Sequence, residues 1–395
     1  MKNILIVADS LSMGGLEKTL IDLCDNLDFT KYNVDLYLFS DGRDLVPKLN
    51  KNINLLPNSP FFSTVFNKSV GVSVKTLIKQ KRLDLAFYRI IRFFKARFKI
   101  QGFSSFDWHY QKKTMLKIEK NYDIAIAFAE GSACYFVADA VKADVKNMWI
   151  HTDIKEIITN KKLDTKAFKK AKNICTVSQN SKNSLARMYP QFKEKIKVFT
   201  LPSLFDFEHI EKLSKEPNEI NKNSINILSV GRLVELKGFH LCIEPCKKLI
   251  DEGYNIKWYV VGDGPQRQEL EALIKQNALE ESFILLGNKE NPYTYIKSAD
   301  ICVQPSSYEG LGLVIYEEKL FKKVVVASNI PSFLEMIKDR QNGLVVERDS
   351  NIIYKAVKEL LDNKNLLKKL SEKPALNFVT KEKTIKEIEK TLKNE

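Results

Sequence analysis

The chain has 395 residues, 44% of them hydrophobic and 28% charged, which is enough apolar material for a core and excludes wholesale disorder. At roughly 150 residues per domain, this length favours two domains. The formal net charge of +14 is concentrated, because residues 68–120 carry 14 basic and three acidic residues. Such a stretch predicts a polyanionic partner: a nucleic acid, a phosphorylated substrate or an anionic membrane surface.

The chain carries no targeting or redox signature. The apolar run at 4–8 is shorter than the core of a signal peptide, and no window of about 18 uncharged apolar residues predicts a transmembrane helix. The six cysteines form no CxxC pair, and only four histidines are present. We therefore expect a cytoplasmic protein with reduced, buried thiols and no metal site or cofactor.

Strand-like and helix-like runs alternate through the first half of the chain. Strands are expected at 3–8, 33–39, 123–128, 147–150, 173–177 and 197–201, with helices over 15–27 and 131–141 among them. Several of the strands are apolar without alternation, which is typical of parallel strands covered on both faces.

Within the basic stretch, the absence of proline permits a long helix over residues 75–99. Its apolar face would consist of Leu83, Phe87, Ile90, Ile91, Phe94 and Phe98. Cations fall on the opposite side of this helix, at positions 81, 92, 95 and 99. A basic amphipathic helix of this kind can lie in the plane of an anionic bilayer. The alternative is a helix whose apolar face packs against its own domain.

The second half repeats the alternation of strands and helices. Strands are expected at 225–230, 256–261, 283–286, 301–304, 324–327 and 344–346. The pattern predicts two doubly wound α/β domains. The polar, proline-containing run at 203–223 is interpreted as a linker between domains at 1–202 and 224–379, and a charged helix is expected over 380–395.

Two strand-to-helix turns contain residues suited to phosphate binding. Gly14 and Gly15 follow the first strand, where glycine lets the backbone approach a phosphate, although a simple tight turn has the same sequence. No G-x-G-x-x-G run is present, so a nicotinamide dinucleotide is disfavoured. Arg232 and Lys237 follow a strand of the second half and can converge on a diphosphate, unless they are two solvated cations.

A third turn, after the strand at 301–304, combines carboxylates with glycines. Glu309 lies in the loop and Glu317 about two turns into the next helix, so the pair can flank one ligand. The backbone amides that can face an anion belong to Gly310, Leu311, Gly312 and Leu313. The alternative is one capping carboxylate and one exposed helix carboxylate.

These motifs, with Val-Gly-Asp-Gly-Pro at 261–265 and Asn-Gly-Leu-Val at 342–345, resemble the retaining GT-B glycosyltransferases of the group 1, or family 4, type. The runs at 122–131 and 149–153 resemble the members that build bacterial capsular and other surface polysaccharides. The resemblance implies two Rossmann-like domains facing a central cleft, with a final helix that crosses back to the first domain. It also implies that the C-terminal domain holds a sugar nucleotide and the N-terminal domain the acceptor.

The resemblance also assigns roles to residues. Arg232 and Lys237 would bind the donor diphosphate, Glu309 the donor sugar and Glu317 the ribose hydroxyls. The glycines at 14 and 15 would let their loop close over the phosphates. His151 matches the histidine that faces the transferred sugar; otherwise it is a core histidine beside a strand. His151 and Glu309 are thus the candidates for contact with the reacting centre.

The family pattern is broken after Glu317. There the usual glycine and proline are replaced by Lys322 and Val324, which affects packing more than donor binding.

The expected activity is that of a retaining, metal-independent hexosyltransferase. It would move a sugar from a nucleoside-diphosphate sugar to a hydroxyl of a glycan or lipid-linked acceptor in bacterial surface polysaccharide synthesis. The sequence holds no DxD motif, so fixed cations and amides must stabilise the leaving diphosphate. We expect a cytoplasmic enzyme, peripheral on the inner face of the cell membrane through residues 75–99. One alternative is a non-catalytic partner subunit with the same fold. The other is a nucleic-acid binder, but the sequence contains no known nucleic-acid-binding motif.

Overall fold

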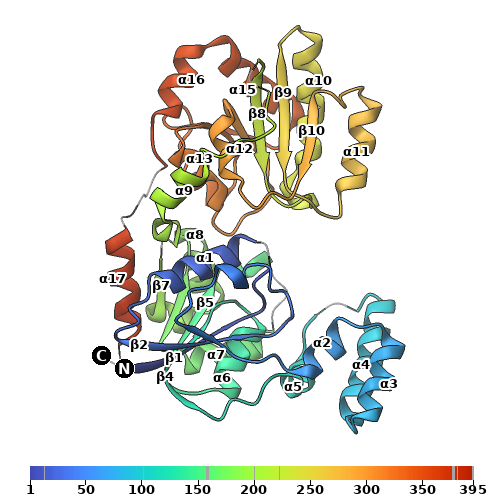
Figure 1. The fold of residues 1–395 in the computed structure, drawn as a ribbon, viewed down its shortest axis with the longest axis vertical. Helices are drawn as coiled ribbons and strands as arrows, with labels where there is room; N and C mark the ends of the chain where they lie inside the picture. Colours follow the sequence, from blue (N-terminus) through green and yellow to red (C-terminus); the bar gives the residue numbers. More distant parts are fainter. Residues whose placement is uncertain are drawn as a thin grey trace. The chain divides into compact units, whose positions relative to one another are not determined.

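The computed structural model describes residues 1–12, 14–100, 102–156, 160–199, 201–221, 223–375, 379 and 381–393. The chain folds into two compact units (Figure 1). Unit 1 comprises Met1–Leu204 together with Thr380–Glu395, and unit 2 comprises Phe205–Val379. Each unit is a parallel sheet with helices on both faces, so the predicted fold class, two doubly wound α/β domains, is confirmed.

Unit 1 is built on a seven-stranded sheet in the order β3-β2-β1-β4-β5-β6-β7. Its strands are β1 (Lys2–Ala8), β2 (Tyr32–Leu38), β3 (Ile53–Leu55), β4 (Asn121–Ala127), β5 (Lys142–Ile150), β6 (Asn173–Thr176) and β7 (Ile196–Val198). Successive residues of β1 point to opposite faces, yet Ile4, Leu5, Ile6 and Val7 are all fully buried. Coverage of both faces explains the unbroken apolar runs. The three-residue β3 was not predicted.

The helices that cover this sheet come from both ends of the chain. They are α1 (Gly15–Asp25), α6 (Ser132–Ala140), α7 (Lys161–Lys170), α8 (Gln179–Met188) and α17 (Lys381–Thr391). The side-chain amide of Asn147 on β5 donates to the Thr391 carbonyl oxygen at 2.9 Å, and Ile388 and Leu392 are buried. The C-terminal helix therefore belongs to unit 1, as expected; residues 380, 394 and 395 lie outside the described residues.

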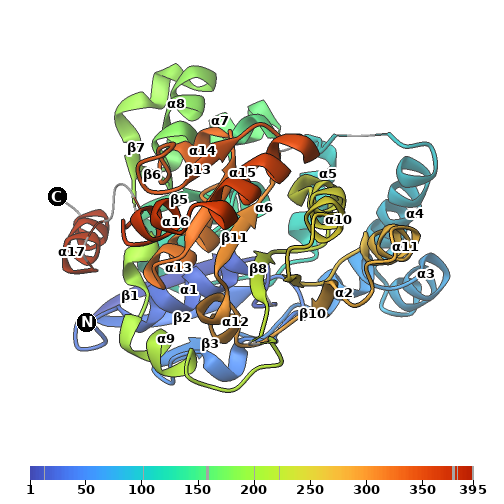
Figure 2. The ribbon, with the colours of Figure 1, turned by 90° about the horizontal axis from the view of Figure 1, so that it is seen from above.

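Four further helices form a lateral part of unit 1: α2 (Pro60–Phe66), α3 (Val70–Lys79), α4 (Leu83–Arg97) and α5 (Ser105–Lys113). The single helix predicted over 75–99 is wrong, because the chain reverses between α3 and α4 through Lys81, which adopts a left-handed conformation (φ 58°). The reversal is stabilised by a small core of Val65, Leu77, Leu85, Ala86 and Tyr88. Figures 1 and 2 show α3 and α4 side by side and apart from the sheet.

Unit 2 repeats the topology with six strands in the order β10-β9-β8-β11-β12-β13. They are β8 (Ile225–Val230), β9 (Ile256–Val261), β10 (Phe283–Gly287), β11 (Ile301–Gln304), β12 (Val324–Ser328) and β13 (Leu344–Val346). The helices are α9 (Phe207–Leu213), α10 (Ile243–Asp251), α11 (Arg267–Gln276), α12 (Tyr293–Ser298), α13 (Leu313–Leu320), α14 (Pro331–Leu334), α15 (Ser350–Asp362) and α16 (Lys364–Ser371). One core cluster lies on each face of the sheet.

The segment interpreted as a linker, 203–223, is largely a folded part of unit 2. It contains α9, and Phe205, Ile210 and Ile220 are buried in one of the two cores. The side-chain amide of Asn218 also donates to the Thr294 hydroxyl at 2.6 Å. Its polar composition concealed three apolar anchors, spaced too irregularly to form a pattern.

In the part of the chain that the structure describes, no helix is both long enough and apolar enough to cross a bilayer. All six cysteines are buried free thiols. Burial raises the pKa of the Cys246 thiol to about 12, which leaves it protonated at neutral pH.

Candidate functional site

Unit 2 has a topological switch point between β8 and β11. Both strands are parallel neighbours, and the chain leaves them in opposite directions across the sheet. Loops after such strands diverge and leave a crevice at the carboxyl edge of the sheet, where ligands bind in open α/β sheets. The loop after β8 carries Arg232 and Lys237, and the loop after β11 carries Glu309.

Close backbone contacts hold the loop after β8 in place. The Gly231 N–H donates to the Val261 carbonyl at 2.9 Å. A Cβ at Gly262 would lie 1.9 Å from the Gly231 carbonyl oxygen, and φ at this residue is +143°, so only glycine fits. A Cβ at Gly238 would similarly lie 2.6 Å from the Pro305 carbonyl oxygen. The glycines of these motifs therefore allow the loops to pack against one another.

Lys237 and Glu309 form an ion pair between the two loops. The Ser306 hydroxyl donates to the same carboxylate oxygen of Glu309 at 2.9 Å, and the Ser307 N–H donates to the Leu236 carbonyl at 2.7 Å. The side chains of Lys237 and Glu309 are only 20% and 15% exposed. Their mutual attraction is consequently screened less than that of a surface pair. Arg232 lies on the same loop and is exposed, so it can turn toward an anion beside Lys237.

The start of α13 presents backbone amides after Gly310 and Leu311. Gly312 caps the helix in a left-handed conformation (φ 79°), and a Cβ there would lie 2.7 Å from the ring of Phe333. Glycine is therefore required at 312 on two grounds, backbone strain and space. Leu313 begins the helix.

Glu317 lies one turn into α13 and is 8% exposed. The Tyr293 hydroxyl approaches its carboxylate at 3.4 Å. This hydroxyl helps to hold the orientation of the carboxylate.

The departures from the family pattern after Glu317 have structural explanations. Glu318 is fully buried and accepts a hydrogen bond of 2.6 Å from Gln304, and burial raises its pKa to about 8. Lys319 is also buried and donates to three backbone carbonyls. Lys322 adopts a left-handed conformation (φ 54°) at the position of the usual glycine. Lysine here adopts a conformation that glycine adopts most readily.

In unit 1, the predicted residues lie at the carboxyl edge of the sheet. Gly14 caps α1 and Gly15 is its first residue. His151 follows β5, and its N–H donates to Glu130 Oε2 at 3.0 Å. Its Nε2 is buried without a hydrogen-bond partner among the described residues. Burial lowers the pKa of His151 to about 3, so the imidazole is neutral at physiological pH.

Three residues in these constellations had no role assigned from the sequence: Glu130, Tyr293 and Ser306. Glu130 follows β4, the neighbour of β5 in the sheet, and it lies in the run at 122–131 that contributes to the family resemblance, but no role was assigned to it individually. Tyr293 is 24 residues from the carboxylate it contacts and had no signal in the motif pattern. Among the described residues, no group of three or more His, Cys, Asp or Glu side chains is placed to hold a metal ion.

Fold and site together define a two-domain α/β protein with charged and amide groups gathered at the switch point of unit 2. Residues 211–375, most of unit 2, match the family described as Glycosyl transferases group 1. The match to group 1 glycosyltransferases thus lies in unit 2, and the fold of the chain is GT-B.

Similar proteins include two bacterial enzymes. The poly(ribitol-phosphate) alpha-N-acetylglucosaminyltransferase of Staphylococcus aureus is 26% identical over 234 residues, which cover 58% of this chain and 47% of the relative. The N-acetylgalactosamine-N,N'-diacetylbacillosaminyl-diphospho-undecaprenol 4-alpha-N-acetylgalactosaminyltransferase of Campylobacter jejuni is 30% identical over 218 residues, which cover 55% of this chain and 58% of the relative. The chain spans about half the length of the curated relatives it matches.

The fold extends over the whole chain in solved structures. Anabaena HepE in complex with UDP and glucose superposes with a TM-score of 0.70 at 18% identity, covering 99% of both chains. Staphylococcus aureus TarM superposes with a TM-score of 0.67 at 14% identity, covering 100% of this chain and 99% of that protein. At such identities the likeness concerns the fold alone.

Proposed function

We propose that the protein is a retaining glycosyltransferase that transfers a hexosyl group from a nucleoside-diphosphate sugar to an acceptor hydroxyl. The observation that carries this proposal is the meeting of Lys237 and Glu309 at the switch point of unit 2, inside the part that matches the family. Lys237 and the exposed Arg232 supply two positive charges where a diphosphate would lie. The amides at the start of α13 supply uncharged donors to the same anion.

The leaving group of the reaction is a nucleoside diphosphate, whose negative charge increases as the glycosidic bond breaks. Fixed cations stabilise that charge without reorganising during the reaction. Lys237 must exchange part of its interaction with Glu309 for the phosphate. This exchange releases the Glu309 carboxylate toward the donor sugar. To Glu317, on α13, we assign the binding of the ribose hydroxyls, which its carboxylate would accept as hydrogen-bond donors.

In unit 1, the Nε2 of His151 is buried and has no hydrogen-bond partner among the described residues, and we assign a sugar hydroxyl as its partner in the donor complex. Because its pKa is low, the ring would act as a neutral hydrogen-bonding group rather than a charge. Gly14 and Gly15 begin α1, and we assign to them the close approach of this loop to the phosphates. We assign no nucleophile to the enzyme, since the acceptor hydroxyl can attack on the face from which the diphosphate leaves.

We propose a glycan or lipid-linked acceptor in bacterial surface polysaccharide synthesis, and action on the inner face of the cell membrane. The name of the Campylobacter relative describes an undecaprenyl-diphosphate-linked acceptor, and a relative from Erwinia amylovora, 27% identical, is named for amylovoran biosynthesis. The charge of residues 68–120 lies in unit 1, the half assigned to the acceptor.

The test is slow hydrolysis of a panel of UDP- and GDP-linked hexoses and N-acetylhexosamines, measured with and without excess EDTA. Turnover of one donor, undiminished by the chelator and releasing the sugar with its original anomeric configuration, is the expected result. Binding of a nucleoside diphosphate without turnover of any donor would instead identify a non-catalytic partner subunit.

A further inference from the structure

The lateral helices of unit 1 expose an unusual amount of apolar surface. Fifteen large hydrophobic side chains are exposed among the described residues, and ten of them lie between positions 72 and 106. The helix α4 carries a continuous stripe, hereafter the α4 stripe: Leu83, Phe87, Ile90, Phe94 and Phe98, with exposures of 66, 54, 39, 50 and 69%. A contiguous patch of this kind marks a surface that is covered in use.

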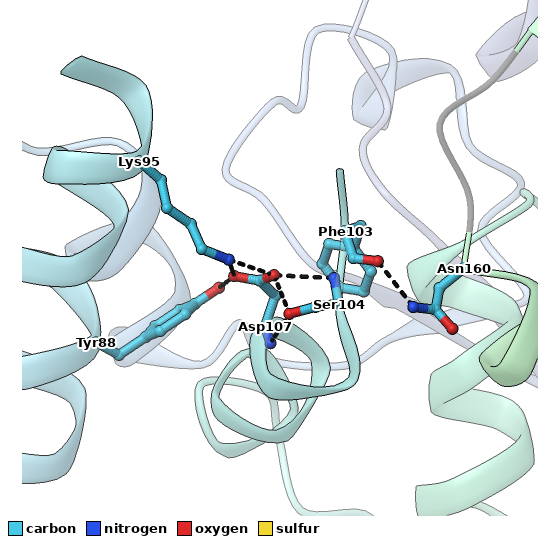
Figure 3. A network of polar contacts seen from close by, with 6 residues as sticks. All are labelled: Tyr88, Lys95, Phe103, Ser104, Asp107 and Asn160. Atoms are coloured by element: carbon cyan, nitrogen blue, oxygen red, sulfur yellow. Dashed lines mark hydrogen bonds and ion pairs between the residues drawn. The ribbon is translucent and has the colours of Figure 1, made fainter. Parts of the chain in front are cut away.

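The opposite side of α4 is the one that packs on the protein. Tyr88 and Lys95 both point at Asp107 at the start of α5, and Lys95 Nζ lies 2.8 Å from its carboxylate (Figure 3). Ser104 donates to the same carboxylate, and the Phe103 carbonyl accepts from Asn160 at the start of α7 (Figure 3). The packed side of α4 is therefore occupied, and the α4 stripe is left facing solvent.

The cations of the hairpin fall into two groups. Four are held internally: Arg82 pairs with Asp84, Arg89 donates to the Lys68 carbonyl, Arg92 lies over the Phe66 ring and Lys95 pairs with Asp107. The exposed group stands on α3 and at both ends of the α4 stripe: Lys75, Lys79, Lys81, Arg97 and Lys99. Exposed apolar residues bracketed by free cations match the interfacial region of an anionic bilayer.

Charge also decides against the other simple occupant, a second copy of the chain. Residues 68–100 contain ten basic residues and one acidic residue. Two copies of this hairpin placed face to face would bring like charges together across a desolvated contact, which is unfavourable. An anionic lipid surface supplies both the negative charge and the apolar depth.

We propose that the α3–α4 hairpin docks the protein on an anionic bilayer by inserting the α4 stripe below the headgroups, with the five exposed cations held at the headgroup level. This deepens the membrane part of the proposed function, on which it rests. The proposal identifies the residues that insert, and it adds the insertion of apolar side chains to the electrostatic attraction expected from the basic charge. It also replaces the packed amphipathic helix considered from the sequence, because that face is exposed.

Depth of insertion is measurable with a tryptophan reporter. The three native tryptophans are all buried, so a Phe94→Trp variant places one accessible indole in the stripe. We expect strong quenching of this fluorescence by lipids brominated on the acyl chains in anionic vesicles. Phe207→Trp is the matched control, since Phe207 is 45% exposed on unit 2 and should show no quenching. Flotation of the Phe94→Trp variant without quenching would refute insertion and leave surface adsorption.

Two sets of substitutions separate the apolar and the charged contributions. Phe87→Ser, Phe94→Ser and Phe98→Ser together should weaken binding to anionic vesicles at least about 100-fold. Lys79→Gln, Lys81→Gln, Arg97→Gln and Lys99→Gln together should weaken it by a similar factor at low salt. Wild-type flotation of the serine variant would overturn the proposal. The proposal would also be overturned if the wild-type protein were a dimer, the serine variant were a monomer, and neither protein floated with the vesicles.

Donor hydrolysis is measured on the same variants, none of which alters a proposed donor-binding residue. We expect hydrolysis to be unchanged in both sets. A protein that floats but hydrolyses no sugar nucleotide would refute the proposed function and leave the docking surface standing. A protein that hydrolyses a donor but does not bind anionic vesicles at low salt would refute the docking surface alone.

Discussion

Replacing Lys237 by alanine tests the central ion pair of unit 2. The change removes a cation whose side chain is 20% exposed. Glu309 then keeps the hydrogen bond that the Ser306 hydroxyl donates to it. The Glu309 side chain is also 15% exposed, so its carboxylate retains both water and a partner, and we expect the loss of stability to be about 1 kcal/mol. The variant should therefore fold, with a melting temperature within a few degrees of the wild-type value.

The effect on catalysis should be much larger than the effect on stability. A hydrogen bond to a charged group is worth roughly 1.5–3 kcal/mol, and removal of one group that stabilises a developing anion costs roughly 2.7–4 kcal/mol. A loss of about 1.4–4 kcal/mol corresponds to a reduction of 10- to 1000-fold in kcat/KM for the donor. The uncompensated Glu309 carboxylate beside the diphosphate places the effect toward the upper end of this range.

The assay is steady-state donor hydrolysis by Lys237→Ala, Arg232→Ala and the double variant, with circular dichroism to verify folding. Lys247→Ala is the matched control, because Lys247 also pairs with a carboxylate, that of Asp251 on α10. The control should retain wild-type kcat/KM. If the folded double variant also turned over donor at the wild-type rate, the assignment of the diphosphate to this loop would be wrong.

Two further substitutions test the backbone and the lateral helices. Gly312→Ala should destabilise the protein by about 2–4 kcal/mol and weaken donor binding, because it combines a left-handed conformation with steric overlap. Gly71→Ala in α3 is the matched control, because a Cβ there would have no atom within 4 Å. In thermal melts this variant should be as stable as the wild type or more stable. Lys95→Met should cost about 1–3 kcal/mol at neutral pH, more than Lys113→Met at an exposed pair, because it strands the 7% exposed Asp107. Burial opposes the ionisation of Asp107, but hydrogen bonds from Lys95 and Ser104 outweigh it and hold the pKa of the carboxyl below its usual value. The stability advantage of the wild type over Lys95→Met should therefore disappear as the pH falls below about 4. A stability difference that persists in denaturant titrations at acid pH would contradict this account.

Local pattern was sufficient for the layers of the fold. Apolar runs such as 4–8 and 124–128 predicted parallel strands covered on both faces. When both faces are covered, every side chain of the strand is buried, and the resulting apolar run can be read without knowing which strands lie beside it. Glycines next to strand ends marked the turns that approach one another closely. At Gly262, for example, a Cβ would lie 1.9 Å from the Gly231 carbonyl oxygen. The motifs after β8 and β11 could be found separately, since each is a short contiguous run.

The meeting of these motifs was decided by tertiary structure. Lys237 and Glu309 are 72 residues apart, and they pair only because β8 and β11 are neighbours across the switch point. The same holds for Glu317 and Tyr293, which come from different helices. Strand order is a property of the whole sheet, so no local window contains it.

The hairpin shows the same limit for an amphipathic helix. Helical spacing grouped six residues on one face, because 3.6 residues per turn depends on the backbone alone, and five of them form the exposed α4 stripe. The sixth, Ile91, is half-buried. It could not determine which face packs on the protein. That depends on what the rest of the chain places beside the helix, and here Asp107 draws Lys95 inward while the reversal at Lys81 brings α3 against Leu85 and Tyr88. Periodicity fixes which side chains share a face, whereas burial of that face requires a partner surface that only the folded chain supplies.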